Sequence, residues 1–151
     1  MSPGLYCVSG TVSMNSNVHL SGIGITIYYT GKSFTINGGI NTELAAPNSP
    51  AHLPTNNAVE DLLLYVPKLE PGDTNRPDIK INGGSGSSFG GTIYAPDSLV
   101  IVNGNATAAD PMTMTTSIIA YDIDMTGTSY VNMVYNSDMD YGWPSNLQQQ
   151  K

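Results

Sequence analysis

The sequence predicts an all-β protein, and within that class a right-handed parallel β-helix, or β-solenoid, with about 20 residues per coil. The first observation is a five-residue phrase that recurs six times: an apolar residue, any residue, a second apolar residue, a small polar residue, then Gly. The second is composition, because only 11% of the residues are charged, against roughly 25% in an average globular domain. The third is that no window holds a helical period for more than two turns.

The recurring phrase predicts a strand that ends in a corner. Its two apolar residues lie on one face of a strand, and the small polar residue and Gly that follow are typical of turns. A strand that ends repeatedly in the same kind of corner indicates coils stacked on one another. The copies are YCVSG at 6–10, VHLSG at 18–22, FTING at 34–38, IKING at 79–83, VIVNG at 100–104 and IDMTG at 123–127.

The spacing of the phrases gives the coil length. Their glycines are separated by 12, 16, 45, 21 and 23 residues. The step of 45 is close to two of the later steps, so we expect about five to seven coils. A left-handed hexapeptide solenoid would show a stricter six-residue beat, which this chain lacks. A β-sandwich is the alternative, since short strands with frequent turns would also fit it.

Other strands are predicted between the phrases, in β-rich runs at residues 25–29, 92–95 and 117–121. The continuous apolar run at residues 62–66 suits a strand buried on both faces, and residues 58–64 allow a single helical turn. Two proline-rich segments, residues 47–57 and 67–78, are predicted as surface loops that leave the coil wall.

The domain boundaries follow from the same pattern. Residues 1–142 are predicted to form a single β-helix domain, and residues 143–151 a polar C-terminal tail. Cys7 is the single cysteine, so it forms no internal disulfide, and its place in a strand phrase predicts a small buried or half-buried apolar residue.

The charge balance excludes some classes of partner. The formal net charge is −7 with a pI of about 4.3, and the few cations are Lys32, Lys68, Arg76, Lys80 and Lys151. Nucleic acids and anionic lipids are therefore poor partners. The chain has no apolar segment long enough to span a membrane, so no membrane segment is predicted in it.

Four aspartates are the candidate metal ligands. Asp122 and Asp124 are two residues apart on a predicted strand, so both carboxylates face outward if Ile123 and Met125 face the core. Pectate-lyase-like β-helices use such acids to bind calcium or as acid and base, but the residues favour the alternative of a solvated outer wall. Asp138 and Asp140 lie in a segment spaced like a calcium loop, but Leu occupies the position of the bidentate Glu. No other cofactor is predicted.

No catalytic pattern was found, and no enzyme activity is predicted. Neither His19 nor His52 has zinc-ligand spacing with Cys7, no Gly-x-Ser-x-Gly elbow precedes a helix, and the Gly-rich residues 83–91 precede neither a helix nor a Lys in phosphate-loop position. The nine tyrosines admit two interpretations. They form either a stacked ladder between coils or an aromatic surface for sugars or protein partners.

Several strand-and-turn pieces resemble a known family. The most specific are INGGS at 81–85 and GGTIYAP at 90–96, followed by an apolar strand that ends at Gly104. Further pieces are PGLY at 3–6, GIGITIY at 22–28, LAAP at 44–47 and IIA at 118–120. In this order, over about residues 3 to 135, they resemble the C-terminal β-helical region of TadG-like proteins, which belong to the Tad/Flp pilus-assembly and cell-envelope proteins of bacteria. The resemblance implies an extracytoplasmic, non-catalytic module at the bacterial cell surface, and it carries over no catalytic residue.

Three functional hypotheses follow. The first is a structural or interaction module for surface display, adhesion or self-assembly, with protein partners or self-association through the ends of the β-helix, where strand edges are unpaired. The second is a carbohydrate-binding module, with glycans as ligands and calcium as a possible aid. The remote third is a polysaccharide lyase or hydrolase, against which the lack of a basic-plus-acidic constellation counts.

Overall fold

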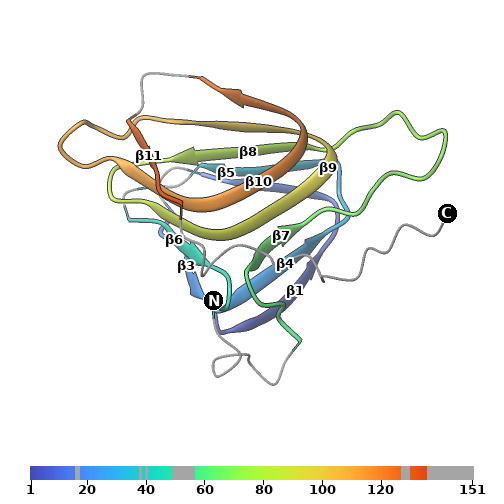
Figure 1. The fold of residues 1–151 in the computed structure, drawn as a ribbon, viewed down its shortest axis with the longest axis horizontal. Coiled ribbons are helices and arrows are strands. Elements are labelled where there is room, and N and C mark those ends of the chain that lie inside the picture. The colour runs from blue at the N-terminus through green and yellow to red at the C-terminus, as the bar shows by residue number, and fades with distance from the viewer. Residues whose placement is uncertain (16–17, 38, 40, 49–56, 127–129, 136–151) are drawn as a thin grey trace, which may run out of the picture.

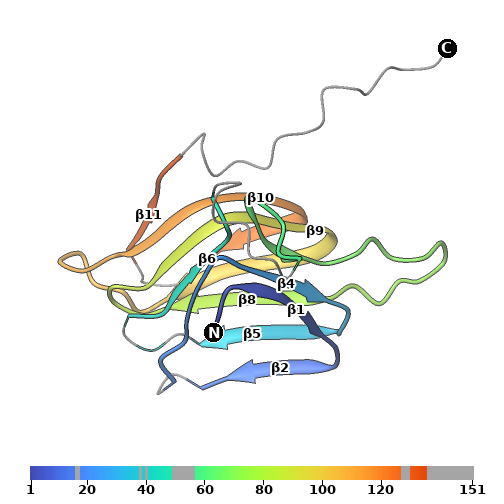
Figure 2. The same ribbon diagram turned by 90° about the horizontal axis from the view of Figure 1, so that it is seen from below.

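The structure is a computed structural model that describes residues 1–15, 18–37, 39, 41–48, 57–126 and 130–135. It is all-β, with parallel strands stacked as a β-solenoid of about five turns and roughly 23 residues per turn. The predicted fold class is confirmed, with a coil slightly longer than expected. Figure 1 looks along the stack, and Figure 2 shows the successive coils lying one above another.

Three walls surround the interior, and each coil contributes one strand or strand segment to each wall. The described strands are β1 (Gly4–Val8), β2 (Thr11–Met14), β3 (Ser21–Ile23), β4 (Ile25–Tyr29), β5 (Ser33–Asn37), β6 (Glu43–Ala45), β7 (Leu62–Tyr65), β8 (Asp78–Gly83), β9 (Ser88–Gly104), β10 (Met112–Met125) and β11 (Val131–Met133).

The long strands β9 and β10 cross the corners, so different segments of them belong to different walls. The first wall stacks β1, β4, β7, residues 92–95 of β9 and residues 117–120 of β10. The second wall stacks β2, β5, β8, then residues 99–104 of β9 and 122–125 of β10. The third stacks β3, β6, residues 88–90 of β9, the start of β10, and β11. All pairs between these strands are parallel, which excludes the antiparallel β-sandwich.

The core is built from apolar residues that occupy equivalent positions on successive coils. On the second wall, one inward row runs from Val12 through Phe34, Ile79 and Val100 to Ile123. The middle three are fully buried, whereas Val12 is half-buried and Ile123 is exposed. Burial is therefore complete in the central coils and incomplete in the first and last. Each fully buried aliphatic side chain contributes about 1.5–3 kcal/mol to folding.

The step of 45 residues between Gly38 and Gly83 is one coil, not two. The residue before each glycine shows this, because Asn37 pairs directly with Asn82 on adjacent strands. The extra length is two insertions, one between β6 and β7 and one between β7 and β8. These contain the two proline-rich segments that the sequence predicts as loops. The prediction that this step spans two coils was wrong because loop length at a corner leaves the register of the walls unchanged.

The six phrases do not all stack on one wall. The copies at 34–38, 79–83, 100–104 and 123–127 share the second wall, whereas the copy at 6–10 lies on the first and that at 18–22 leads into the third. Gly38 and Gly127 are outside the described residues. Close approach explains Gly83, because a Cβ there would lie 2.0 Å from the sulfur of Met112 on the next coil.

Strand β7 is covered on both faces, as predicted for residues 62–66. The residues that precede it, 58–61, are held by Thr26 of the neighbouring coil. The Thr26 hydroxyl accepts a hydrogen bond from the N–H of Val59 at 2.8 Å and donates one to the carbonyl of Leu62 at 2.8 Å. Residues 59–62 form a turn, with the N–H of Leu62 donating to the carbonyl of Val59, so the single helical turn that 58–64 allowed is not formed.

The predicted loops are partly described. Residues 66–77 project outward from the stack as a loop between β7 and β8 (Figure 1) and are mostly exposed, in agreement with the predicted excursion at 67–78, although Asp78 already belongs to β8. In the segment 47–57, residues 49–56 lie outside the described residues. So do residues 136–151, which include the predicted tail at 143–151; the described residues up to 135 form one stack.

Tyr29 is the last residue of β4, and its buried side chain makes hydrogen bonds at the corner that leads to β5. Its hydroxyl lies 2.6 Å from the carbonyl oxygen of Gly10 and 2.7 Å from that of Ser33, and it accepts the Ser33 N–H at 2.9 Å. The side chain is fully buried, and its ring packs edge-on against Phe34. Burial raises the pKa of the Tyr29 phenol above 10.0, and the hydrogen bond to Ser33 offsets part of that rise.

We expect the inward row to dominate stability, which two identical substitutions can test. Ile79→Ala should lower the free energy of unfolding by roughly 2–5 kcal/mol, because Ile79 is fully buried between two coils. Ile101→Ala, on the outer side of the same wall, should cost about 1 kcal/mol because its side chain is only half-buried. Urea unfolding followed by circular dichroism measures both. Equal losses would contradict the inward and outward assignment.

Alkaline pH should destabilise the protein through Tyr29. Because the pKa of Tyr29 is raised in the folded state, that state holds the phenol proton more tightly than the unfolded chain does. This stabilisation is complete below the unfolded pKa of about 10 and is lost as pH rises through the folded pKa. The free energy of unfolding should therefore fall more steeply from pH 9 to 11 in the wild type than in Tyr29→Phe. Parallel pH profiles would show that Tyr29 is not the responsible group.

Candidate interaction surfaces

Three tyrosines form a ladder on the outside of the first wall. Tyr28, Tyr65 and Tyr94 occupy one register position on three successive coils. The rings of Tyr28 and Tyr65 are stacked with centroids 5.7 Å apart, and those of Tyr65 and Tyr94 at 5.3 Å, with interplanar angles of 12° and 7°. The sequence left two interpretations open for the tyrosines. For these three, the stacked ladder between coils is confirmed.

The ladder geometry restricts what these rings can bind. Both faces of the Tyr65 ring are covered by its neighbours, so a sugar ring cannot stack on it. Tyr28 and Tyr94, at the two ends of the ladder, each stack on one ring. The main contribution of the ladder is therefore to hold successive coils in register from the outside.

Cys7 continues this row on the first coil, directly opposite Tyr28. It is exposed, so the prediction of a buried or half-buried cysteine was wrong. The physical reason is alternation along β1. Tyr6 and Val8 pack against the core, which directs the intervening Cys7 outward.

Small polar side chains cover the second wall on the first two coils. Its outer rows run from Thr11 and Ser33 to Asp78 and Leu99, and from Ser13 and Thr35 to Lys80 and Ile101. At the end of the wall, Asn82 donates a side-chain hydrogen bond to Asn37 at 2.5 Å. Such contacts between equivalent residues on neighbouring coils fix the corner.

Asp122 and Asp124 end these two outer rows on the last coil. They pair in register with Leu99 and Ile101, and both are exposed on the outer side, as the sequence analysis expects. Ile123, between them, has the inward register of the core row, yet 44% of its surface is exposed because no described coil follows.

The remaining metal candidates, Asp138 and Asp140, lie outside the described residues, as does His52. Among the residues that the structure describes, no group of three or more His, Cys, Asp or Glu side chains could hold a metal ion. Calcium binding at Asp122 and Asp124 therefore stays a prediction. His19 is exposed and precedes β3.

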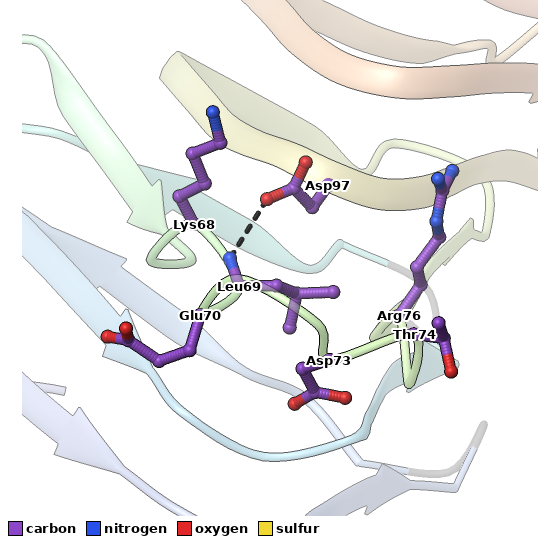
Figure 3. A pocket seen from close by; sticks show the side chains of 7 residues that line it. All are labelled: Lys68, Leu69, Glu70, Asp73, Thr74, Arg76 and Asp97. Atoms are coloured by element: carbon purple, nitrogen blue, oxygen red, sulfur yellow. Dashed lines mark hydrogen bonds between the residues drawn. The ribbon is translucent and has the colours of Figure 1, made fainter.

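A small cavity of about 240 Å³ lies between the loop at residues 66–77 and the corner of β9 (Figure 3). Its lining comes from two separate segments: Lys68, Leu69, Glu70, Asp73, Thr74 and Arg76 from the loop, and Asp97 from β9. Two of its carboxylates accept backbone hydrogen bonds, Asp97 from Leu69 at 2.9 Å and Asp73 from Asn75 at 2.8 Å. These bonds shape the loop.

Arg76 attaches the same loop to the last coil. Its guanidinium carbon lies 3.4 Å from the centre of the Tyr121 ring, a cation–π contact that links residues 45 positions apart. Tyr121 follows the first-wall segment of β10, so the contact spans the corner between the first and second walls. The chain's only arginine thus contributes to structure at this corner.

The last coil carries the clearest exposed apolar surface among the described residues. Four large apolar side chains there are about half exposed: Ile123 at 44%, Met125 at 49%, Met133 at 50% and Val134 at 49%. The first three continue inward rows of the core. We call this set the C-terminal end face.

The first coil is open in a similar way. Its inward residues are only half-buried although they pack against the core, namely Tyr6, Val8, Val12, Met14 and Leu20. We call this set the N-terminal end face. Among the described strands, β1 and β2 each pair with a single neighbour, and residues 117–125 of β10 pair with β9 alone.

Sequence reasoning anticipated the open ends but not the residues that form them. The six phrases gave the inward apolar pairs without indicating which coils would be terminal. It also missed that Asp97 and Tyr121 meet the loop at residues 66–77, because no local pattern links segments that are 20 or more residues apart. One sequence signal did distinguish the two ends of the stack by charge, since residues 1–42 contain no Asp or Glu.

No described residue belongs to a helix long and apolar enough to cross a membrane. In comparisons with known proteins, no family model, no curated protein and no solved structure matches this chain.

The ladder should contribute to stability in proportion to the number of stacked neighbours. Tyr65→Leu removes two ring contacts and Tyr28→Leu removes one, each pair being worth about 0.5–1.5 kcal/mol beyond area burial. We therefore expect the first variant to lose about twice as much unfolding free energy as the second. Tyr130→Leu, exposed on the last coil, is the matched control and should change little. A ranking with Tyr28 above Tyr65 would contradict an energetic role for stacking.

Proposed function

We propose that this chain is a non-catalytic structural or interaction module of a bacterial cell envelope or pilus-assembly system, acting outside the cytoplasm. The observation that carries the proposal is the C-terminal end face, where Ile123, Met125 and Met133 are about half exposed at core positions. An exposed apolar surface that continues a core is typical of a surface that a partner covers.

The roles of the polar side chains support the same proposal. The Thr26 hydroxyl fastens residues 58–61, Asp97 holds the loop at residues 66–77, and the only arginine stacks on Tyr121. These polar side chains, which would be candidates for a binding or catalytic site, thus make contacts that hold loops to the solenoid.

The resemblance to TadG-like proteins supports the location and the class of partner. Its most specific pieces, INGGS at 81–85 and GGTIYAP at 90–96, form the centre of the solenoid, with Tyr94 in the ladder. An envelope role is therefore proposed from that resemblance, and an interaction role from the end face.

Binding to bacterial envelopes tests the proposal. The purified chain should sediment with envelopes from bacteria that assemble Tad pili, and Ile123→Lys with Met125→Lys should reduce binding by about tenfold, because charge on an apolar contact is costly. Asn75→Lys, in the exposed loop, is the matched control and should bind like the wild type. Wild-type protein that stays in the supernatant would contradict the envelope role. Product release from a panel of polyuronates and neutral glycans would contradict the non-catalytic role.

A further inference from the structure

We propose that copies of this chain associate head to tail, with the C-terminal end face of one copy on the N-terminal end face of the next, so that the solenoid continues across the contact. The inference deepens the proposed interaction role, on which it rests, by naming a second copy as the partner. Three features of the described residues carry it.

The first feature is the continuity of the apolar rows. The register through all five coils places Ile123 in the row that begins at Val12, and Met125 in the row that begins at Met14. A second copy stacked in this register would therefore cover Ile123 with Val12 and Met125 with Met14. On the third wall the first coil is already covered, because the N-terminal amine of Met1 donates to the carbonyl of Ser21 and Met1 lies against Gly22. The proposed contact is therefore made by the first and second walls.

The second feature is complementarity of the outer rows. By the same register, Asp122 would lie beside Thr11 of the next copy, and Asp124 beside Ser13. Adjacent strands in a sheet are about 4.8 Å apart, so each carboxylate could accept a hydrogen bond from a hydroxyl, which is the stronger, charge-assisted kind.

The third feature is the distribution of charge along the stack. Residues 1–42 contain no Asp or Glu and one Lys, whereas residues 104–135 contain Asp110, Asp122 and Asp124 and no Lys or Arg. Joining two C-terminal end faces would bring two acidic coils together, which like-charge repulsion disfavours. Joining unlike ends brings the acidic coil against one without carboxylates.

The strand edges add a directional argument. Residues 117–125 of β10 and strands β1 and β2 each have one side unpaired among the described strands. In a head-to-tail contact these edges run parallel, as every pair within the solenoid does, so the inward and outward alternation is preserved. A heterologous contact of this kind does not close on itself, and it produces a filament.

Two variants that each block one end test the proposal. Thr11→Asp with Ser13→Asp places carboxylates opposite Asp122 and Asp124 while changing only exposed side chains of the first coil. Ile123→Lys with Met125→Lys blocks the other end. Sedimentation velocity should show that the wild type grows with concentration and that either variant alone stays monomeric. An equimolar mixture of the two should form a one-to-one dimer through the two intact ends.

Each outcome decides the proposal. A dimer formed by either variant alone would reveal a contact between like ends and would overturn it, as would a wild type that stays monomeric at all concentrations. If both variants assembled to the same size as the control Asn75→Lys, the contact would lie elsewhere on the molecule, and the proposal would be overturned. By electron microscopy, wild-type filaments should have the width of a single solenoid.

A charge exchange provides a second test that does not depend on the apolar substitutions. Adding Asp122→Lys and Asp124→Lys to the Thr11→Asp, Ser13→Asp chain restores attraction across the head-to-tail contact. We expect the first pair to remain monomeric at concentrations where the wild type assembles, and the four-residue variant to assemble again. Failure of the folded four-residue variant to recover would overturn the register. These measurements use purified protein alone, so self-association without envelope binding would separate this inference from the proposed function.

Discussion

The whole structure depends on the parallel register between successive coils. Once equivalent residues are stacked about 4.8 Å apart, one set of backbone hydrogen bonds fixes the walls, and like side chains fall on like side chains. The buried row of Phe34, Ile79 and Val100 and the stacked tyrosines outside the first wall are two consequences of this one constraint. Polar side chains at equivalent positions also contact one another, as the hydrogen bond between Asn82 and Asn37 shows.

The same constraint explains why long insertions leave the stack intact. Residues 46–48, 57–61 and 66–77 lie outside the strands, and β6, β7 and β8 keep their register with the neighbouring coils on either side of these segments. Each insertion is then fastened by a few specific contacts, at Thr26 for one and at Asp97 and Tyr121 for the other. The described part of each insertion is thereby held to the stack at these points.

A stack of this kind has two ends at which the register has no further partner. There the inward side chains keep their apolar character but lose their cover, which is why Ile123 is exposed whereas Val100, one coil earlier, is buried. The ends also differ in charge, because the carboxylates are concentrated away from the first coil. The register that builds the core thus leaves two ends that differ in charge, and we propose that these ends are functional.

The sequence by itself determined the fold class, since the apolar pairs followed by a small polar residue and Gly report local strand and corner chemistry. It also determined the outward position of Asp122 and Asp124, which alternation along a strand imposes. Only the tertiary structure decided which strands are neighbours, and it therefore decided that the 45-residue step is one coil and that Tyr28, Tyr65 and Tyr94 share a row. It likewise decided that Cys7 is exposed and that Arg76 meets Tyr121. The reason is that the sequence periodicity records what each strand does locally, whereas the pairing between coils depends on corner lengths that vary freely.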